Sequence, residues 1–283
     1  MEISAAAVKA LRDKTNAGMM DCKKALVESG GDMEKAIEYL RKMGAVTAEK
    51  RMDRTANEGV ILTSVEGGEG SIVEVNCETD FVARSTDFLA FARRVLETVK
   101  REKPVDLPAL MSSMSDGRTL QDHLTELIGK IGEKIAVKRF RVFPKGNVLV
   151  DYVHPGSKLG VIVELEAPSA ATPILEVGKS LAMQVAAMNP LAVDRESVPT
   201  ETREKELEIY REQARNERKP ENLIERIATG KLNKFFQEFT LLEQSYIRDN
   251  TKTVKEYIET ASKECGVPIV VKRFARFQVG ESE

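Results

Sequence analysis

The chain has 283 residues, of which 42% are hydrophobic and 31% are charged, a composition typical of a folded globular protein rather than a disordered one. Its 43 basic and 45 acidic side chains nearly cancel, so a nucleic-acid role would need a local basic patch. No apolar run approaches the roughly 20 residues of a membrane-spanning helix. The N-terminal residues begin with a helical pattern and lack the features of a signal or transit peptide, so we expect no membrane association.

The cysteines are three in number and far apart in the sequence, at Cys22, Cys77 and Cys265. Because they show no Cys-x-x-Cys spacing, both a disulfide framework and a zinc site are disfavoured. We expect small buried hydrophobic side chains in a reducing compartment. The sequence therefore predicts a cytoplasmic protein.

The first 45 residues have the pattern of three short amphipathic helices. The Asn-Ala-Gly turn at 16–18 ends the first helix and the glycines at 30–31 end the second, since Asn and Gly tolerate positive φ. Asp32 can cap the third helix, and Gly44 supplies its stop. Helices this short must pack on one another to bury their apolar stripes. They predict a small helical domain, followed by a polar linker at 47–58.

A mixed unit of strands and helices follows the linker. Two β-rich runs flank a glycine-rich turn at 66–70, which predicts a hairpin. The next helix has Ser85 or Thr86 as its cap and apolar residues at helical spacing. The predicted order is a hairpin with strands over 60–62 and 72–75, a helix over 88–99, a helix over 120–128 and a closing strand over 135–143.

The same order of elements then recurs in the second half of the chain. Residues 160–165 match 70–75 at a shift of 90 positions, whereas 269–274 repeat 135–140 at a shift of 134. The two shifts differ because the second copy contains an insertion of about 44 residues.

The insertion has the pattern of a helical hairpin. It follows a helix that opens at Thr172-Pro173, with Thr172 as the cap, and ends at Asn189-Pro190. A charged helix over 200–216 is joined to a second helix over 223–236 by the turn 218–220. A turn this short makes the two helices antiparallel, and a long charged hairpin favours a role as a contact arm.

These elements predict an α+β fold with a duplicated core. The expected units are a three-helix domain over 1–46, a linker over 47–58, core subdomain N over 59–145, and core subdomain C over 146–283 with the hairpin inserted at about 198–239.

Few side chains offer themselves for catalysis. We expect His123 to be a solvated surface group, while His154 lies in a turn where a polar turn role and a contact role both stay open. A hydrolase centred on His154 with Asp151 or Glu164 is one alternative, but the sequence offers no nucleophile for it. The glycines near 67–70 lack the Lys-Ser/Thr of a phosphate-binding loop.

The two Lys-Arg-Phe repeats at 138–140 and 272–274 suggest a second alternative, a sheet that stacks RNA bases on aromatic side chains. Because residues alternate along a strand, we expect instead that the phenylalanines lie in the core and the basic groups are solvated.

The segment 78–84 is the strongest candidate for function. It connects a strand end to a helix start and carries Asp80 beside Phe81. In the repeat, position 81 corresponds to Ala171, so the common architecture does not require an aromatic residue here. This asymmetry favours a contact with a partner over a place in the core.

Two long motifs resemble the bacterial translation elongation factor Ts family. The first runs from Leu11 to Leu26, with Asn16 where glycine is usual, and the second runs from Glu74 to Ala83. Residues 130–133 and 154–156 also match the family, and so does 242–246, where Ser245 stands in place of the usual proline and Tyr246 in place of phenylalanine.

The resemblance implies a guanine-nucleotide exchange factor that binds elongation factor Tu·GDP, displaces Mg²⁺ and promotes GDP release, without covalent chemistry or a cofactor. It implies a ubiquitin-associated-like (UBA-like) head and a coiled-coil hairpin. It also implies no direct contact with nucleic acid or membrane, and it allows a 2:2 assembly with the partner.

The resemblance also assigns residue roles. Phe81 would insert into the GTPase domain of the partner, Asp80 would help to displace Mg²⁺, and Thr79 and Val82 would shape the loop. The remaining partner contacts that it implies, on the head and on the two subdomains, are Arg12, Met19, Met20, Lys23, Ile131, Gly132, His154, Tyr246 and Ile247.

Overall fold

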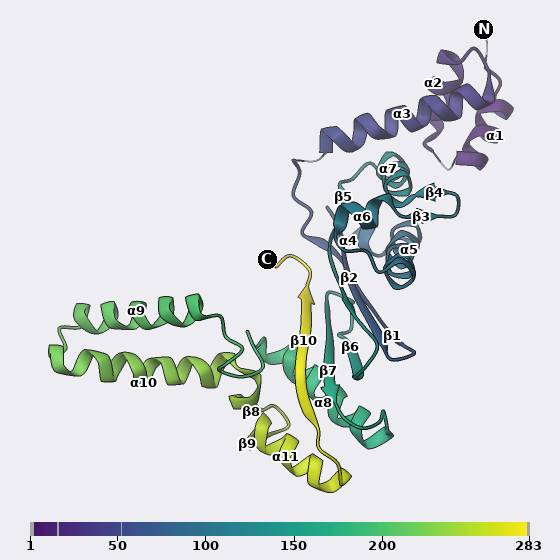
Figure 1. Ribbon diagram of the computed structural model, residues 1–283. Helices are drawn as coiled ribbons and strands as arrows, with labels where there is room; N and C mark the ends of the chain where they lie inside the picture. Colours follow the sequence, from purple (N-terminus) through teal and green to yellow (C-terminus); the bar gives the residue numbers. More distant parts are fainter. Residues whose placement is uncertain (1–2, 16, 52, 282–283) are drawn as a thin grey trace.

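The computed structural model describes residues 3–15, 17–51 and 53–281. The molecule is elongated, with a helical head at one end, a layered α+β body in the middle and a helical hairpin projecting from the other end (Figure 1). In the described part of the chain, no helix combines the length and the apolar character needed to cross a membrane.

The head consists of α1 (Ala5–Thr15), α2 (Met19–Glu28) and α3 (Met33–Arg51). Leu11, Cys22 and Leu26 are fully buried between them. Asp32 caps α3 as predicted, because its Oδ1 accepts hydrogen bonds from the backbone N–H groups of Glu34 and Lys35 at 3.0 Å each. The predicted Asn-Ala-Gly turn includes residue 16, which lies outside the described residues.

The predicted stop at Gly44 is wrong, because α3 continues to Arg51. Gly44 instead lies against Gly129 of α7 (Leu120–Ile131), where a Cβ added to Gly129 would come within 3.0 Å of the Gly44 Cα. A glycine at position 44 is needed for this close approach of α3 and α7. Helix α3 therefore joins the head to the body without a break at that position.

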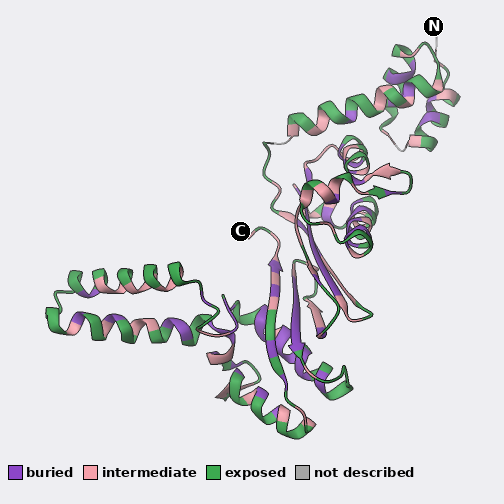
Figure 2. Ribbon diagram, in the orientation of Figure 1, coloured by how far each residue is buried: buried purple, intermediate pink, exposed green. Residues whose placement is uncertain are grey.

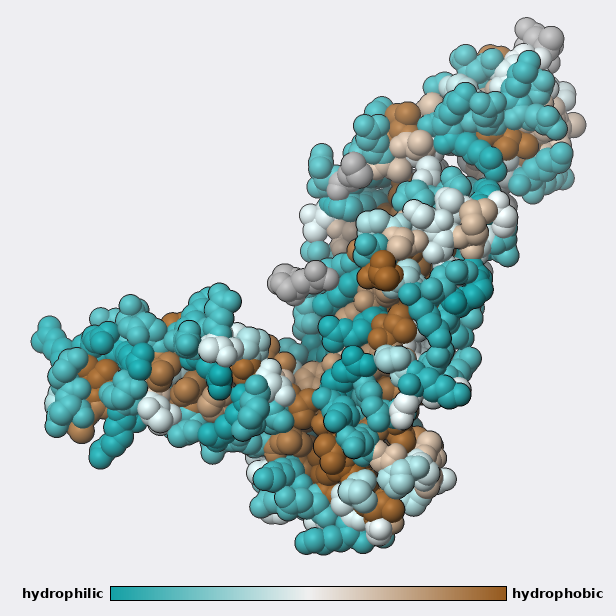
Figure 3. Space-filling view, in the orientation of Figure 1, coloured by the Kyte–Doolittle hydropathy of each residue, from teal (hydrophilic) through white to brown (hydrophobic). Residues whose placement is uncertain are grey.

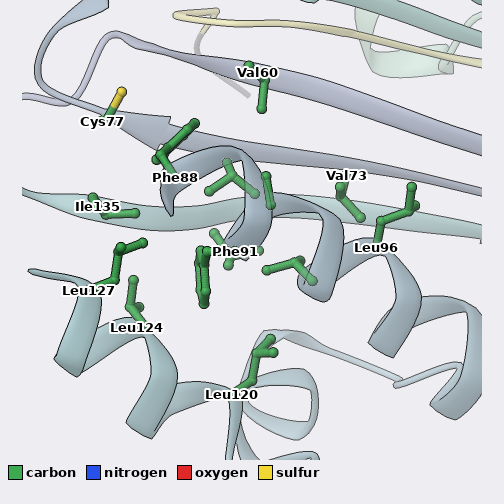
Figure 4. Close-up of a cluster of buried hydrophobic side chains, with 14 of the residues drawn as sticks. Val60, Val73, Cys77, Phe88, Phe91, Leu96, Leu120, Leu124, Leu127 and Ile135 are labelled. Carbon is green, nitrogen blue, oxygen red and sulfur yellow. The ribbon is translucent and has the colours of Figure 1, made fainter. Parts of the chain in front are cut away.

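The first sheet has the antiparallel order β1-β2-β5, with β1 at Glu58–Glu66, β2 at Glu69–Cys77 and β5 at Ile135–Phe143. Gly67 and Gly68 form the hairpin turn at φ 59° and 83°, as their lack of a side chain permits. Helices α5 (Thr86–Glu102), α6 (Leu107–Ser112) and α7 cover one face, and side chains of α5 and α7 fill the space against the strands (Figure 4). Ser85, not Thr86, caps α5.

The second sheet has the order β10-β7-β6, with β6 at Val148–Val153, β7 at Leu159–Glu166 and β10 at Val270–Gln278. Helices α8 (Thr172–Met188) and α11 (Val254–Cys265) cover its outer face. Ala171 takes the N-cap position of α8 without a side-chain bond, so the predicted Thr172 cap is wrong. The short elements that complete the two copies are α4 (Asp80–Ala83), β3 (Met114–Ser115), β4 (Arg118–Thr119), η1 (Leu241–Glu243), β8 (Ser245–Tyr246) and β9 (Asp249–Thr253).

The two sheets pack face to face, which gives the body four layers, with helices outside and sheets inside. The buried strands between the helical layers stand out in Figure 2. Gly70 and its repeat equivalent Gly160 let the sheets approach: a Cβ on Gly160 would lie 2.5 Å from Ile61 Cγ2, and one on Gly70 would lie 3.0 Å from Leu149 Cδ1. The cluster between the sheets consists of Ile61, Ile72, Phe143, Leu149, Ile162, Ala275 and Phe277.

The arginines of the two Lys-Arg-Phe repeats also join the sheets. Arg139 pairs with fully buried Glu74 at 2.7 Å and lies 4.4 Å over the Phe277 ring of the other sheet. Arg273 pairs in the same way with Glu164 and lies 4.9 Å over Phe143. The Arg139 side chain is only 16% exposed, so the expectation that it is solvated is wrong, whereas the Arg273 side chain keeps 48% exposure, as expected.

The hairpin consists of α9 (Thr200–Asn216) and α10 (Glu221–Phe239), which run antiparallel as predicted. Arg211 of α9 forms a bidentate pair with Glu225 of α10 at 2.8 and 2.9 Å. Ala214, Ile224 and Ala228 are buried in the narrow seam between the helices. Hydrophobic side chains gather where this hairpin meets the body (Figure 3).

Candidate partner-binding site

The candidate segment forms a short turn of helix that displays one aromatic ring. Thr79 is the N-cap of α4, and its hydroxyl accepts a hydrogen bond from the Val82 backbone N–H at 3.4 Å. Val82 packs against the first core cluster and Ala83 is buried, which anchors the back of the turn. Phe81 points away from this support and is 83% exposed. Removing that surface from water would favour contact with a partner.

Asp80 stands beside this ring at the start of α4. Its carboxylate forms an ion pair with Arg84 one turn later, with 3.1 Å between Oδ2 and Nη2. Both side chains are substantially exposed, so the pair is weak and the carboxylate can exchange Arg84 for another cation.

Two glutamates that were not predicted as site residues support the turn. Both oxygens of Glu133 accept hydrogen bonds from Thr79, one from the backbone N–H at 3.1 Å and one from the hydroxyl at 2.7 Å. Glu78 accepts from the backbone N–H of Lys134 at 2.6 Å and pairs with Arg54 at 3.1 Å. The only sequence signal for these contacts is that both acids lie within the matched motifs, at 74–83 and 130–133.

The surroundings of the turn shift two pKa values. Burial alone would raise the pKa of the Glu78 carboxyl, but the Lys134 N–H and the arginines at 51 and 54 together hold it below its usual range. Burial, assisted by the negative charges of Glu133 and Glu58, raises the pKa of the Cys77 thiol to about 12. Cys77 is therefore a neutral core group, as predicted for it.

Ile131 and Gly132 lie at the end of α7, directly before Glu133. Gly132 adopts φ 79° and ends the helix in the left-handed conformation. Ile131 packs partly against the first core cluster. The bonds from Glu133 to Thr79 bring this helix end to the base of the Phe81 turn, so the structure unites these predicted residues with the turn.

The predicted head residues form a separate surface on α1 and α2. Met20 is 73% exposed and Met19 is 56% exposed, and the charged groups of Arg12 and Lys23 are also at the surface. Val27, which was not predicted, is 54% exposed and follows Lys23 on the same side of α2. Helices α1 and α2 lie well apart from α4 in Figure 1, so these residues form a second contact surface rather than part of the turn.

Of the two partner contacts predicted near β8 on the second subdomain, one side chain is exposed and the other is buried. Tyr246 is 5% exposed and stacks on Tyr257, with ring centroids 4.1 Å apart and planes at 10°. This burial argues against the direct contact predicted for Tyr246. Ile247 is 42% exposed, and its backbone N–H donates to the Gln184 side chain at 2.8 Å.

The histidines do not form a hydrolytic site. His154 is exposed in the turn between β6 and β7, and its Nδ1 lies 2.8 Å from the Tyr152 hydroxyl. Asp151 accepts a hydrogen bond from Thr63, and Glu164 is held by Asn147 and Arg273, so both acids of the proposed hydrolase are engaged elsewhere.

His123 is half-buried rather than fully solvated, which corrects the sequence-based expectation. Its Nε2 lies 2.9 Å from the Ser115 carbonyl oxygen, and its Nδ1 lies 3.3 Å from Arg118, so it ties α7 to the β3–β4 hairpin. Within the described residues, no three His, Cys, Asp or Glu side chains gather closely enough to hold a metal ion.

An exposed aromatic ring on a braced turn, together with exposed apolar side chains on the head, is typical of a surface that docks on another macromolecule. A family model described as Elongation factor TS matches residues 78–281. Proteins named elongation factor Ts from Chlorobium phaeobacteroides strain BS1 and Chloroherpeton thalassium are 50% and 48% identical over 287 residues, which is 99% of each chain. One from Clostridium perfringens strain SM101 is 46% identical over 283 residues, 99% of this chain and 93% of that protein. The chain belongs to the elongation factor Ts family of translation elongation factors.

Proposed function

We propose that this chain is a guanine-nucleotide exchange factor that binds elongation factor Tu·GDP and promotes GDP release, so that GTP can bind during translation elongation. The observation that carries the proposal is the 83% exposure of Phe81 within a family motif that the second copy of the fold lacks. Membership of the elongation factor Ts family supports the same partner.

The proposed mechanism needs binding only. A GTPase holds its nucleotide largely through phosphate contacts and Mg²⁺. A protein that binds the nucleotide-free state better must weaken nucleotide binding by the same factor. Insertion of Phe81 into the partner would contribute about 1.5–3 kcal/mol toward that state. Asp80, whose present partner Arg84 is exposed, would help to displace the Mg²⁺ held by the partner.

Further contacts would share the binding energy. The head over 1–46, as a UBA-like domain, would grip the GTPase domain through Arg12, Met19, Met20 and Lys23. Core subdomain N (59–145) would add Ile131 and Gly132. Core subdomain C (146–283) would add His154 and Ile247, next to buried Tyr246. The antiparallel hairpin would be a coiled-coil arm.

The test is release of fluorescently labelled GDP from elongation factor Tu of the same organism. With unlabelled GTP in excess, a substoichiometric amount of this chain should accelerate complete release, because GTP binding frees the exchange factor in each cycle. No acceleration, with both proteins shown to be folded, would refute the proposed function. The stoichiometry of the complex, including a 2:2 assembly, would be read from its mass in solution.

A further inference from the structure

The base of the Phe81 turn is held by two glutamates that bond in opposite directions. Glu133, which follows α7, accepts from the backbone N–H and the hydroxyl of Thr79 at 3.1 and 2.7 Å. In return Glu78, which precedes α4, accepts from the backbone N–H of Lys134 at 2.6 Å. We call these reciprocal bonds the clasp. Hydrogen bonds to a carboxylate are among the stronger ones in proteins, and here they connect two loops rather than two turns of one helix.

The clasp also reaches the head. Glu78 pairs with Arg51, the last residue of α3, at 3.5 Å and with Arg54 in the following linker at 3.1 Å. The Glu78 and Arg51 side chains are only 19% and 24% exposed, so solvent weakens their attraction less than that of a fully exposed pair. One carboxylate therefore links the head, the Phe81 turn and the end of α7.

The second copy of the fold shows that the architecture does not need the clasp. The positions equivalent to Glu78 and Lys134 are Pro168 and Pro268, and the position equivalent to Glu133 is Val267. Proline has no backbone N–H and valine has no acceptor, so neither bond can form there.

The corresponding helix end nevertheless keeps its shape without the clasp. Gly266 ends α11 at φ 69°, and Gly132 ends α7 at φ 79°. Ala171 replaces Phe81 in that same copy. The clasp is therefore found in the copy that has the exposed aromatic residue, and the fold itself does not require it.

We infer that Glu78 and Glu133 are positioning residues for nucleotide exchange, which hold the Phe81 turn in one exposed conformation and connect it to the head. An exposed phenylalanine on an unbraced turn would lose exposed apolar area by folding back onto the protein surface. A braced turn has less conformational freedom to lose on binding, so the partner is bound more tightly without any additional contact. This inference rests on the proposed exchange function.

The variant that tests the clasp is Glu133→Gln, because an amide keeps the size of the side chain but can accept only one of the two Thr79 bonds. Glu256→Gln is the control for loss of the charge alone. Glu256 also accepts two bonds from one threonine, at 2.7 Å from the Thr253 backbone N–H and 3.1 Å from its hydroxyl, but both reach the same oxygen, so an amide can keep both. Thermal unfolding shows whether both variants fold.

Two readouts separate positioning from folding. Hydrogen exchange of the amides at 79–83 should be about tenfold faster in Glu133→Gln and change by less than about twofold in Glu256→Gln. The efficiency of GDP release from elongation factor Tu should fall by about fivefold or more in Glu133→Gln only, through weaker binding of the partner. Glu78→Gln keeps an acceptor for Lys134 but loses its charge, so it should release the head and have a smaller effect on the turn.

The outcomes are distinguishable. Unchanged amide protection at 79–83 in Glu133→Gln would overturn the clasp even if the wild-type protein exchanges nucleotide normally. Faster amide exchange with unchanged GDP release would overturn the positioning role. Failure of the wild-type protein to accelerate GDP release would instead refute the proposed function, while the hydrogen-exchange result would still report on the turn.

Discussion

Replacing Phe81 by alanine should separate function from stability. Phe81 is 83% exposed, so its removal should change the free energy of unfolding by no more than about 0.5 kcal/mol. Phe88, seven residues later and fully buried under the first sheet, is the matched control (Figure 4). Phe88→Ala should cost about 3–5 kcal/mol, because it removes a large core side chain and leaves a cavity.

Although Phe81→Ala should lose little stability, it should lose much of its exchange efficiency. Burial of a phenylalanine ring in the partner is worth about 1.5–3 kcal/mol, which corresponds to an affinity for nucleotide-free elongation factor Tu that is about 10- to 150-fold weaker in Phe81→Ala. Urea unfolding gives the stability, and GDP release at subsaturating concentrations gives the exchange efficiency. If Phe81→Ala loses several kcal/mol of stability, or keeps both its stability and its full exchange efficiency, the assignment of Phe81 is refuted.

Three further predictions concern the body. Gly160→Val should destabilise the protein by about 1–3 kcal/mol, seen as a lower urea midpoint, because its Cβ would meet Ile61; an added Ile61→Ala should recover part of the loss. Arg139→Met should cost about 3–5 kcal/mol by leaving Glu74 buried and poorly paired, and adding Glu74→Gln should restore part of the unfolding free energy. The raised pKa of Cys77, about 12, keeps its thiol protonated in the folded protein while the unfolded thiol ionises nearer 9.0. Its contribution to stability should therefore be lost as pH rises from about 9 toward 12, and alkylation at pH 9 should be much slower at Cys77 than at Cys265.

Local sequence signals were sufficient for most of the elements. The strand Ile135–Phe143 and the helix Thr200–Asn216 have the predicted bounds, because alternation, helical periodicity and a short turn act over a few residues. The repeat shifts of 90 and 134 also foretold two sheets of similar order. Even so, the repeats gave no sign that the two sheets pack face to face.

The errors arose where distant residues meet. Gly44 looks like a helix stop, and only Gly129, far along the chain, explains why the helix continues past it. Alternation placed Arg139 in solvent, whereas the ring of Phe277 on the second sheet covers it. The resemblance implied a partner contact for Tyr246, and the sequence could not show that Tyr257 stacks on it.

The candidate site was predictable in part, and for a specific reason. The exposure of Phe81 was inferred from its replacement by Ala171 in the second copy, an argument available because the fold is duplicated. The supporting role of Glu133 was not predicted, because Glu133 and Thr79 are 54 positions apart and only the folded chain brings them together.

An exchange factor must discriminate between two states of its partner. The most direct measurement compares its affinity for elongation factor Tu in the nucleotide-free form and in the GDP·Mg²⁺ form. We expect much tighter binding to the nucleotide-free form, by the same factor by which this chain weakens GDP binding. Equal affinities would contradict it, because a ligand that binds both states equally shifts neither.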